Sequence, residues 1–141
     1  MIYAGVTADI RATRGAFAVV YGRGEDVHYD AFTPAAFEKA LDEVNPLEIR
    51  CVIEMPDEGI METPEKMNPA TFARMYCNKR GVPFMFVKTG SLRRELNMAD
   101  DQTMVRECKL RYPDVEIRGE ERQQEETAKA VLLAKYARRF L

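Results

Sequence analysis

The chain has 141 residues, 46% of them hydrophobic, which is enough apolar material for the core of one domain spanning residues 1–141. It contains no apolar run long enough to cross a bilayer. An acidic residue also occurs early in the N-terminal segment, where a signal peptide would have a basic region. We therefore expect a cytoplasmic protein without a membrane partner. The net charge of −2 argues against a nucleic-acid partner, because such domains are usually basic, but it does not exclude a local basic face.

Alternating apolar stretches and turn residues predict five strands and four helices along the chain. The strands are expected over residues 2–7, 16–21, 27–29, 49–55 and 82–87. The helices are expected over residues 34–43, 69–80, 100–110 and 120–140. Thr33 before Pro34 is a typical helix start, and Gly81 a typical helix end. This order indicates an α/β fold, a mixed sheet of about five strands with helices on both faces.

The cysteines and the single histidine do not suggest a metal centre. Cys51, Cys77 and Cys108 lie far apart, without a C-x-x-C spacing, and His28 alone adds too little for a zinc cluster. We therefore interpret the cysteines as buried reduced thiols and His28 as a residue on a strand surface.

Three acidic residues fall at the edges of predicted elements. Asp9 directly follows the first strand, Glu54 ends a strand that is apolar on both faces, and Glu126 lies near the start of the last helix. Such edges are where open α/β sheets build their sites. Carboxylates hold Mg²⁺ or Mn²⁺, and these ions assist the hydrolysis of a negatively charged phosphodiester. With 23 acidic residues in the chain, chance alone also places some of them at strand ends.

Basic residues border these acids along the sequence. Each by itself is most simply a solvated surface charge, but together they suit contacts to the phosphates of a nucleic acid. The candidates are Arg11, Arg14, Lys79, Arg80, Lys88, Arg93 and Arg94.

Four segments together resemble the RuvC-type Holliday-junction resolvases of the ribonuclease-H-like superfamily. Residues 5–20 are similar to the family's opening strand, Asp and turn, with the sequence GVTADIRATRGAFAVV. Residues 51–56, CVIEMP, resemble the strand that ends in a catalytic Glu, and residues 127–134, TAKAVLLA, resemble the last helix. Residues 82–96 are similar to the compact phage versions. The resemblance spans most of the chain in the correct order and implies a ribonuclease-H-like fold.

The resemblance also implies an activity and a site. It implies a divalent-metal-dependent endonuclease that cleaves Holliday junctions or other branched DNA in recombination and repair, acting as a homodimer with Mg²⁺ or Mn²⁺. Asp9 would be the first-strand metal ligand, Glu54 the ligand between two metals, and Glu126 the first acidic position of the last helix, with Glu125 as a further ligand. For the dimer, the resemblance points to a helix stripe, although its spacing is also that of ordinary core residues: Phe72, Met75 and Tyr76.

Lys129 departs from the family pattern. The family usually has a second acid or an equivalent ligand three residues after the position of Glu126, one turn along the same helix face. A charged lysine there cannot ligate a metal and would repel a second cation, although it could contact DNA. Glu125 or Glu121 would substitute if the helix were rotated. Three outcomes stay open: an enzyme with an altered site, a one-metal enzyme, and a junction-binding protein that has lost cleavage.

Two other functions compete with the nuclease. The first is a RuvC-like module that binds branched nucleic acid without cleaving it, which Lys129 favours. The second is a sugar-kinase-like or actin-like ATPase, which shares the core topology. That reading requires further glycine-rich phosphate loops and a second similar domain, for which 141 residues are too few.

Overall fold

The structure is a computed structural model, and it describes residues 1–8, 15–21, 26–55, 68–98, 100–117 and 119–141. Within these ranges the strands are β1 (Ile2–Ala8), β2 (Gly15–Tyr21), β3 (Asp26–Ala31), β4 (Ile49–Met55) and β5 (Phe84–Lys88). The helices there are α1 (Pro34–Leu41), α2 (Pro69–Arg80), α3 (Thr89–Leu96), α4 (Asp101–Arg111) and α5 (Glu121–Phe140), with a 3-10 turn over Pro46–Glu48.

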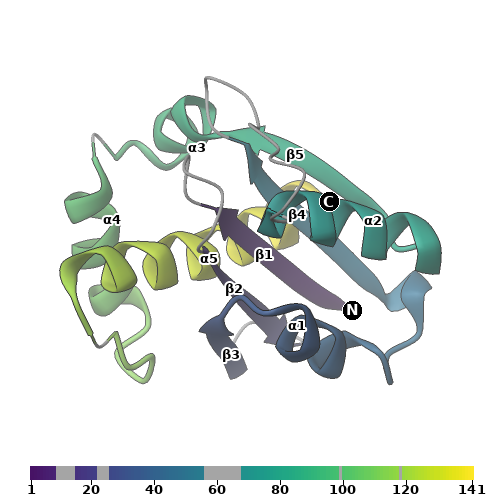
Figure 1. The fold of residues 1–141 in the computed structure, drawn as a ribbon. Helices are drawn as coiled ribbons and strands as arrows, with labels where there is room; N and C mark the ends of the chain where they lie inside the picture. Colours follow the sequence, from purple (N-terminus) through teal and green to yellow (C-terminus); the bar gives the residue numbers. More distant parts are fainter. Residues whose placement is uncertain (9–14, 22–25, 56–67, 99, 118) are drawn as a thin grey trace.

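The strands form one mixed sheet in the order β3-β2-β1-β4-β5 (Figure 1). β1 pairs antiparallel with β2, and β2 antiparallel with β3, as expected for strands joined by turns. β4 pairs parallel with both β1 and β5, so these three strands end at one edge of the sheet, which we call the carboxyl edge. The predicted mixed five-stranded sheet is confirmed.

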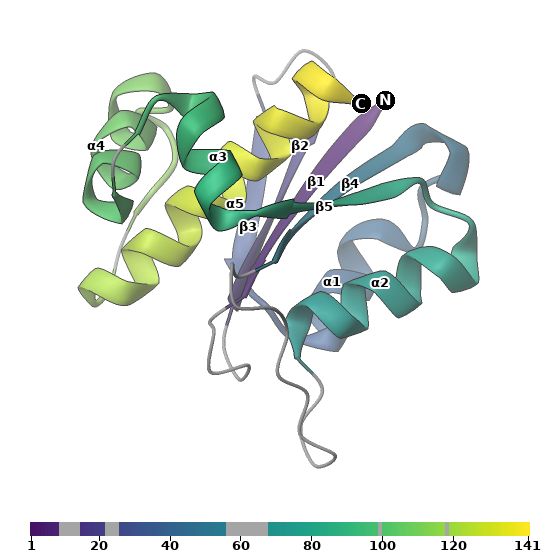
Figure 2. The same cartoon turned by 90° about the horizontal axis from the view of Figure 1, so that it is seen from above.

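Helices cover both faces of the sheet, as predicted (Figure 2). On one face α1 and α2 pack over a core that includes Phe17, Phe37 and Ile53, all fully buried. On the other face lie α3, α4 and α5, and their core includes Val52 and Leu133. Consecutive residues of β4 thus enter opposite cores, which explains why this strand reads as a continuous apolar run.

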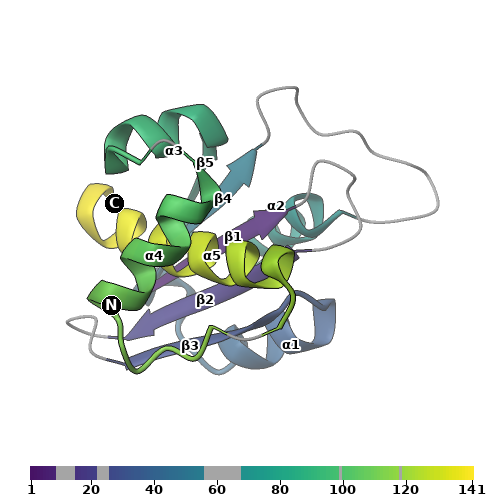
Figure 3. The same cartoon turned by 90° about the vertical axis from the view of Figure 1, so that its left-hand side faces the viewer.

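α5 lies directly against β1, and Gly5 makes this close approach possible (Figure 3). A Cβ atom added at Gly5 would collide with the Ala130 carbonyl oxygen and the Ala134 amide nitrogen, and would lie 2.7 Å from the Leu133 Cβ. Backbone atoms of a packed helix cannot move aside as a flexible side chain can. The small residue at position 5 therefore sets the position of α5 over the sheet, and with it the position of residue 129.

Local sequence signals account for most helix ends. Thr33 caps α1, with its Oγ1 accepting a hydrogen bond from the Ala36 amide at 3.1 Å. Asn68 caps α2 in the same way, and Gly81 ends it with a φ of 73°. The sequence did not predict α3, for two reasons. The N-cap residue of this helix makes no side-chain cap hydrogen bond, and the helix buries a single residue, Leu92, which produces no periodic apolar pattern.

The helix stripe on α2 is mainly core. Phe72 packs against the buried cluster under α1 and α2, and Tyr76 is 8% exposed. Met75 is 50% exposed, so it is the member of the stripe that could meet a partner. The homodimer therefore stays a prediction.

The remaining sequence expectations concern the cysteines and the membrane. Cys51, Cys77 and Cys108 are buried and unbridged, as predicted. Burial raises the pKa of the Cys108 thiol to about 12. No helix in the described part of the chain combines the length and the apolar character that a bilayer crossing requires.

Candidate active site

Glu54 stands at the carboxyl edge of the sheet with its side chain only 1% exposed. It is the next-to-last residue of β4, and in the parallel register it pairs with Val87 of β5. Thr7 lies near the end of β1, and Thr89 directly follows β5. The ends of three parallel strands thus bring these polar side chains together, at the kind of edge where α/β sheets bind ligands.

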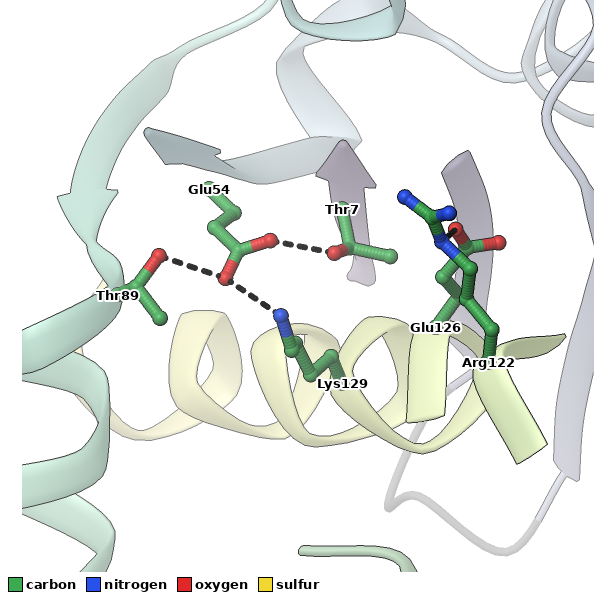
Figure 4. A network of polar contacts seen from close by, with 6 residues as sticks. All are labelled: Thr7, Glu54, Thr89, Arg122, Glu126 and Lys129. Carbon is green, nitrogen blue, oxygen red and sulfur yellow. Dashed lines mark hydrogen bonds and ion pairs between the residues drawn. The ribbon is translucent and has the colours of Figure 1, made fainter. Parts of the chain in front are cut away.

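Three donors hold the Glu54 carboxylate (Figure 4). Thr7 Oγ1 donates a hydrogen bond of 2.5 Å to Glu54 Oε1, and Thr89 Oγ1 donates one of 2.9 Å to Oε2. The Lys129 Nζ lies 3.3 Å from the same Oε2. A buried carboxylate requires such partners, since burial without them would cost several kcal/mol. The network orients the carboxylate and compensates its charge.

Glu126 and Lys129 lie one turn apart on α5, and both side chains rise from the helix toward the strands (Figure 4). The Glu126 side chain is 14% exposed, and its Oε1 lies 3.8 Å from the Arg122 Nε. Lys129 is equally well buried, at 14%. The described contacts therefore connect Glu54 with Lys129, and Glu126 with Arg122.

The predicted acidic triad is described only in part. Asp9 lies outside the described residues, as do Arg11 and Arg14. Among the residues whose placement is described, no three His, Cys, Asp or Glu side chains gather into a group that could hold a metal ion. Glu54 and Glu126 remain as candidate ligands on two different elements, and Glu125 is a partly exposed residue of α5.

Three of the predicted basic residues lie at the end of β5 or on the helix that follows it. Lys88 ends β5, and Arg93 and Arg94 lie on α3, which begins at Thr89. We call these three residues the α3 cations. Lys88 and Arg94 are exposed and Arg93 is partly exposed. The α3 cations thus place positive charge at the end of β5 and along α3, on the β5 side of the carboxyl edge.

Lys79 and Arg80 lie at the opposite edge, because α2 runs back to the start of β5. The Arg80 guanidinium donates hydrogen bonds to the carbonyl oxygens of Leu41 at 2.8 Å and Val44 at 2.9 Å. It also donates one of 2.8 Å to the Tyr76 hydroxyl. Arg80 therefore joins the end of α2 to the last residue of α1 and the segment after it. The basic residues that are close in sequence are thus divided between two edges.

Sequence reasoning missed Thr7 and Thr89. Thr7 ends the predicted strand over 2–7, and Thr89 lies two residues after the predicted strand over 82–87, so both share with Glu54 a position at the end of a strand. Hydroxyl side chains at such positions can orient a neighbouring carboxylate by donating a hydrogen bond.

Comparison with solved structures finds the same architecture. Thermus thermophilus RuvC in complex with a Holliday junction substrate matches with a TM-score of 0.64 and 16% identity, covering 99% of this chain and 96% of that one. A second Thermus thermophilus RuvC structure matches with a TM-score of 0.62 and 17% identity, with the same coverage. No protein-family model matches the sequence, and comparison with curated proteins finds no match. The chain thus has the RuvC-like, ribonuclease-H-like fold that its sequence motifs predicted.

Proposed function

We propose that this protein is a divalent-metal-dependent endonuclease that cleaves branched DNA such as the four-way Holliday junction. The observation that carries the proposal is Glu54, a carboxylate 1% exposed at the carboxyl edge of a RuvC-like sheet. A buried charge of this kind is poor evidence of a stabilising role, since well-packed apolar residues often serve stability as well or better. Its position and its dedicated hydroxyl partners therefore favour a role in chemistry.

The Glu54 carboxylate keeps a lone pair with which it would ligate a divalent cation. Mg²⁺ and Mn²⁺ prefer carboxylate oxygens, and an ionised carboxylate has about four lone-pair sites, of which the described contacts use three. Asp9, Glu54 and Glu126 would hold the ion, with Glu125 as a further candidate. When bound, the ion would neutralise charge on the phosphodiester and promote ionisation of the attacking water.

The other residues of the site would orient and bind. Thr7 and Thr89 would keep the Glu54 carboxylate in one orientation, because each donates to a different carboxylate oxygen. The α3 cations, together with Arg11 and Arg14, would contact the phosphates of the DNA and make binding dependent on salt concentration. Lys79 and Arg80 lie at the opposite edge of the sheet, and we leave them out of this proposed surface.

The test is incubation of a labelled four-way junction and a matched linear duplex with the protein in Mg²⁺ or Mn²⁺. We expect paired, symmetrical nicks in the junction, produced by a homodimer, and no nicks with Asp9→Asn or Glu54→Gln. If folded Glu54→Gln cleaved as well as the unaltered protein, the proposed site would be wrong.

A junction that is retarded in a gel but stays intact would support a second function. In that case the protein would bind branched DNA without cutting it. The observation that favours this alternative is the Lys129 ammonium, which lies against the proposed metal ligand at 3.3 Å.

A further inference from the structure

Lys129 carries a positive charge into the position where a second acidic ligand is expected. Its Nζ lies 3.3 Å from Glu54 Oε2, and the two side chains are 14% and 1% exposed. We propose that the Lys129 ammonium replaces a second divalent ion, so that the site binds one divalent cation instead of two. This inference rests on the metal site of the proposed function, not on cleavage itself, and adds a residue role to that site.

The carboxylate cannot easily turn away from the lysine. Thr7 holds one oxygen of Glu54 from β1, and Thr89 holds the other from the start of α3. A rotation that separated Glu54 from Lys129 would break at least one of these hydrogen bonds. Glu54 is therefore presented to the ammonium by two elements that are themselves packed in the fold.

Backbone packing also fixes the point from which the Lys129 side chain starts. Its neighbour Ala130 meets Gly5 of β1 at a distance that leaves no room for even a Cβ atom. α5 cannot approach the sheet more closely there, and the buried residues Ala128 and Val131 on either side of Lys129 hold the helix down. The ion pair thus differs from a surface pair, in which two long side chains lose conformational freedom when they meet.

Charge then limits how many metal ions the carboxylate can share. A protonated lysine has no lone pair to donate, so Lys129 cannot ligate a metal. A divalent ion beside the same carboxylate would be repelled by the ammonium, and burial weakens the screening of that repulsion by water and salt. The Lys129 ammonium therefore supplies one of the positive charges at the site.

The test counts Mn²⁺ ions per chain without DNA, by the electron paramagnetic resonance signal of the unbound ion. We expect one Mn²⁺ in the unaltered protein and in Lys129→Arg, which retains the charge. Lys129→Asp should bind two, and Glu54→Gln should lose the site. Lys129→Met, which removes the charge with little change of shape, should bind its first Mn²⁺ at least about tenfold more tightly.

Three results would overturn the inference. The first is that the unaltered protein binds two Mn²⁺ ions and Glu54→Gln binds neither. The second is that the unaltered protein binds no ion, and the third is that a folded Lys129→Asp still binds only one. If Lys129→Asp fails to fold, unchanged Mn²⁺ affinity in Lys129→Met overturns it instead. Because the count needs no cleavage, one bound ion beside an uncut junction would refute the nuclease proposal and leave the inference standing.

Discussion

Replacing Lys129 with methionine should destabilise the protein in the absence of metal. The change removes the ammonium 3.3 Å from a carboxylate that is 1% exposed. Removing one partner of a buried ion pair typically costs about 3–5 kcal/mol, because the other charge stays buried without compensation. Here the hydroxyls of Thr7 and Thr89 still donate to the carboxylate, so we expect the lower end, about 3 kcal/mol.

Urea unfolding followed by circular dichroism, with EDTA present, measures this loss. Lys79→Met is the matched control, because Lys79 is exposed at the end of α2 and its replacement should change the free energy of unfolding by less than about 0.5 kcal/mol. The double variant Glu54→Gln/Lys129→Met should recover part of the loss, because it removes both charges. Equal costs for Lys129→Met and Lys79→Met, or a double variant less stable than Lys129→Met, would refute the argument that the pair is buried and coupled.

Three further predictions concern the fold. Gly5→Ala should lower the free energy of unfolding by about 3 kcal/mol, because the new methyl group meets the Ala130 backbone; an unchanged urea midpoint would contradict the close approach of α5. Arg80→Ala should lower the free energy of unfolding by about 2–3 kcal/mol, because the carbonyl groups that Arg80 contacts lose their hydrogen-bond donor. Lys79→Ala in the same urea assay should leave the free energy of unfolding nearly unchanged. The pKa of Cys108 is raised from about 9 to about 12. Since the unfolded thiol ionises first, stability should fall between these pH values, and less so in Cys108→Ala; an equal fall in both proteins would speak against this burial.

Most of the secondary structure could be predicted from the sequence because the signals for it are local. The strand over 49–55 matches β4 because an apolar run bounded by Pro56 can lie between two helical layers. The starts of α1 and α2 match because a capping side chain followed by proline acts within three residues. α3 lacks such a signal, and its one buried residue, Leu92, is too little to produce a periodic pattern.

The candidate site could be predicted only as a set of positions. The end of an apolar strand marked Glu54, and the last helix marked Glu126 and Lys129, each from local pattern or family resemblance. The partners of these residues could not be predicted in this way. Arg80 shows the difference most clearly, since its sequence position suited a phosphate contact and its hydrogen bonds lead instead to the backbone at and after the end of α1.

The sequence by itself determined the order of the strands and of the helices other than α3, the buried character of β4 and the presence of a carboxylate at its end. Only the tertiary structure decided what that carboxylate meets. Lys129 lies 75 residues from Glu54 along the chain, and the contact arises because β1 and β4 pair in parallel register while Gly5 lets α5 lie against β1. Local patterns determine which residues form an element, whereas register and packing between distant elements determine which charges share a site.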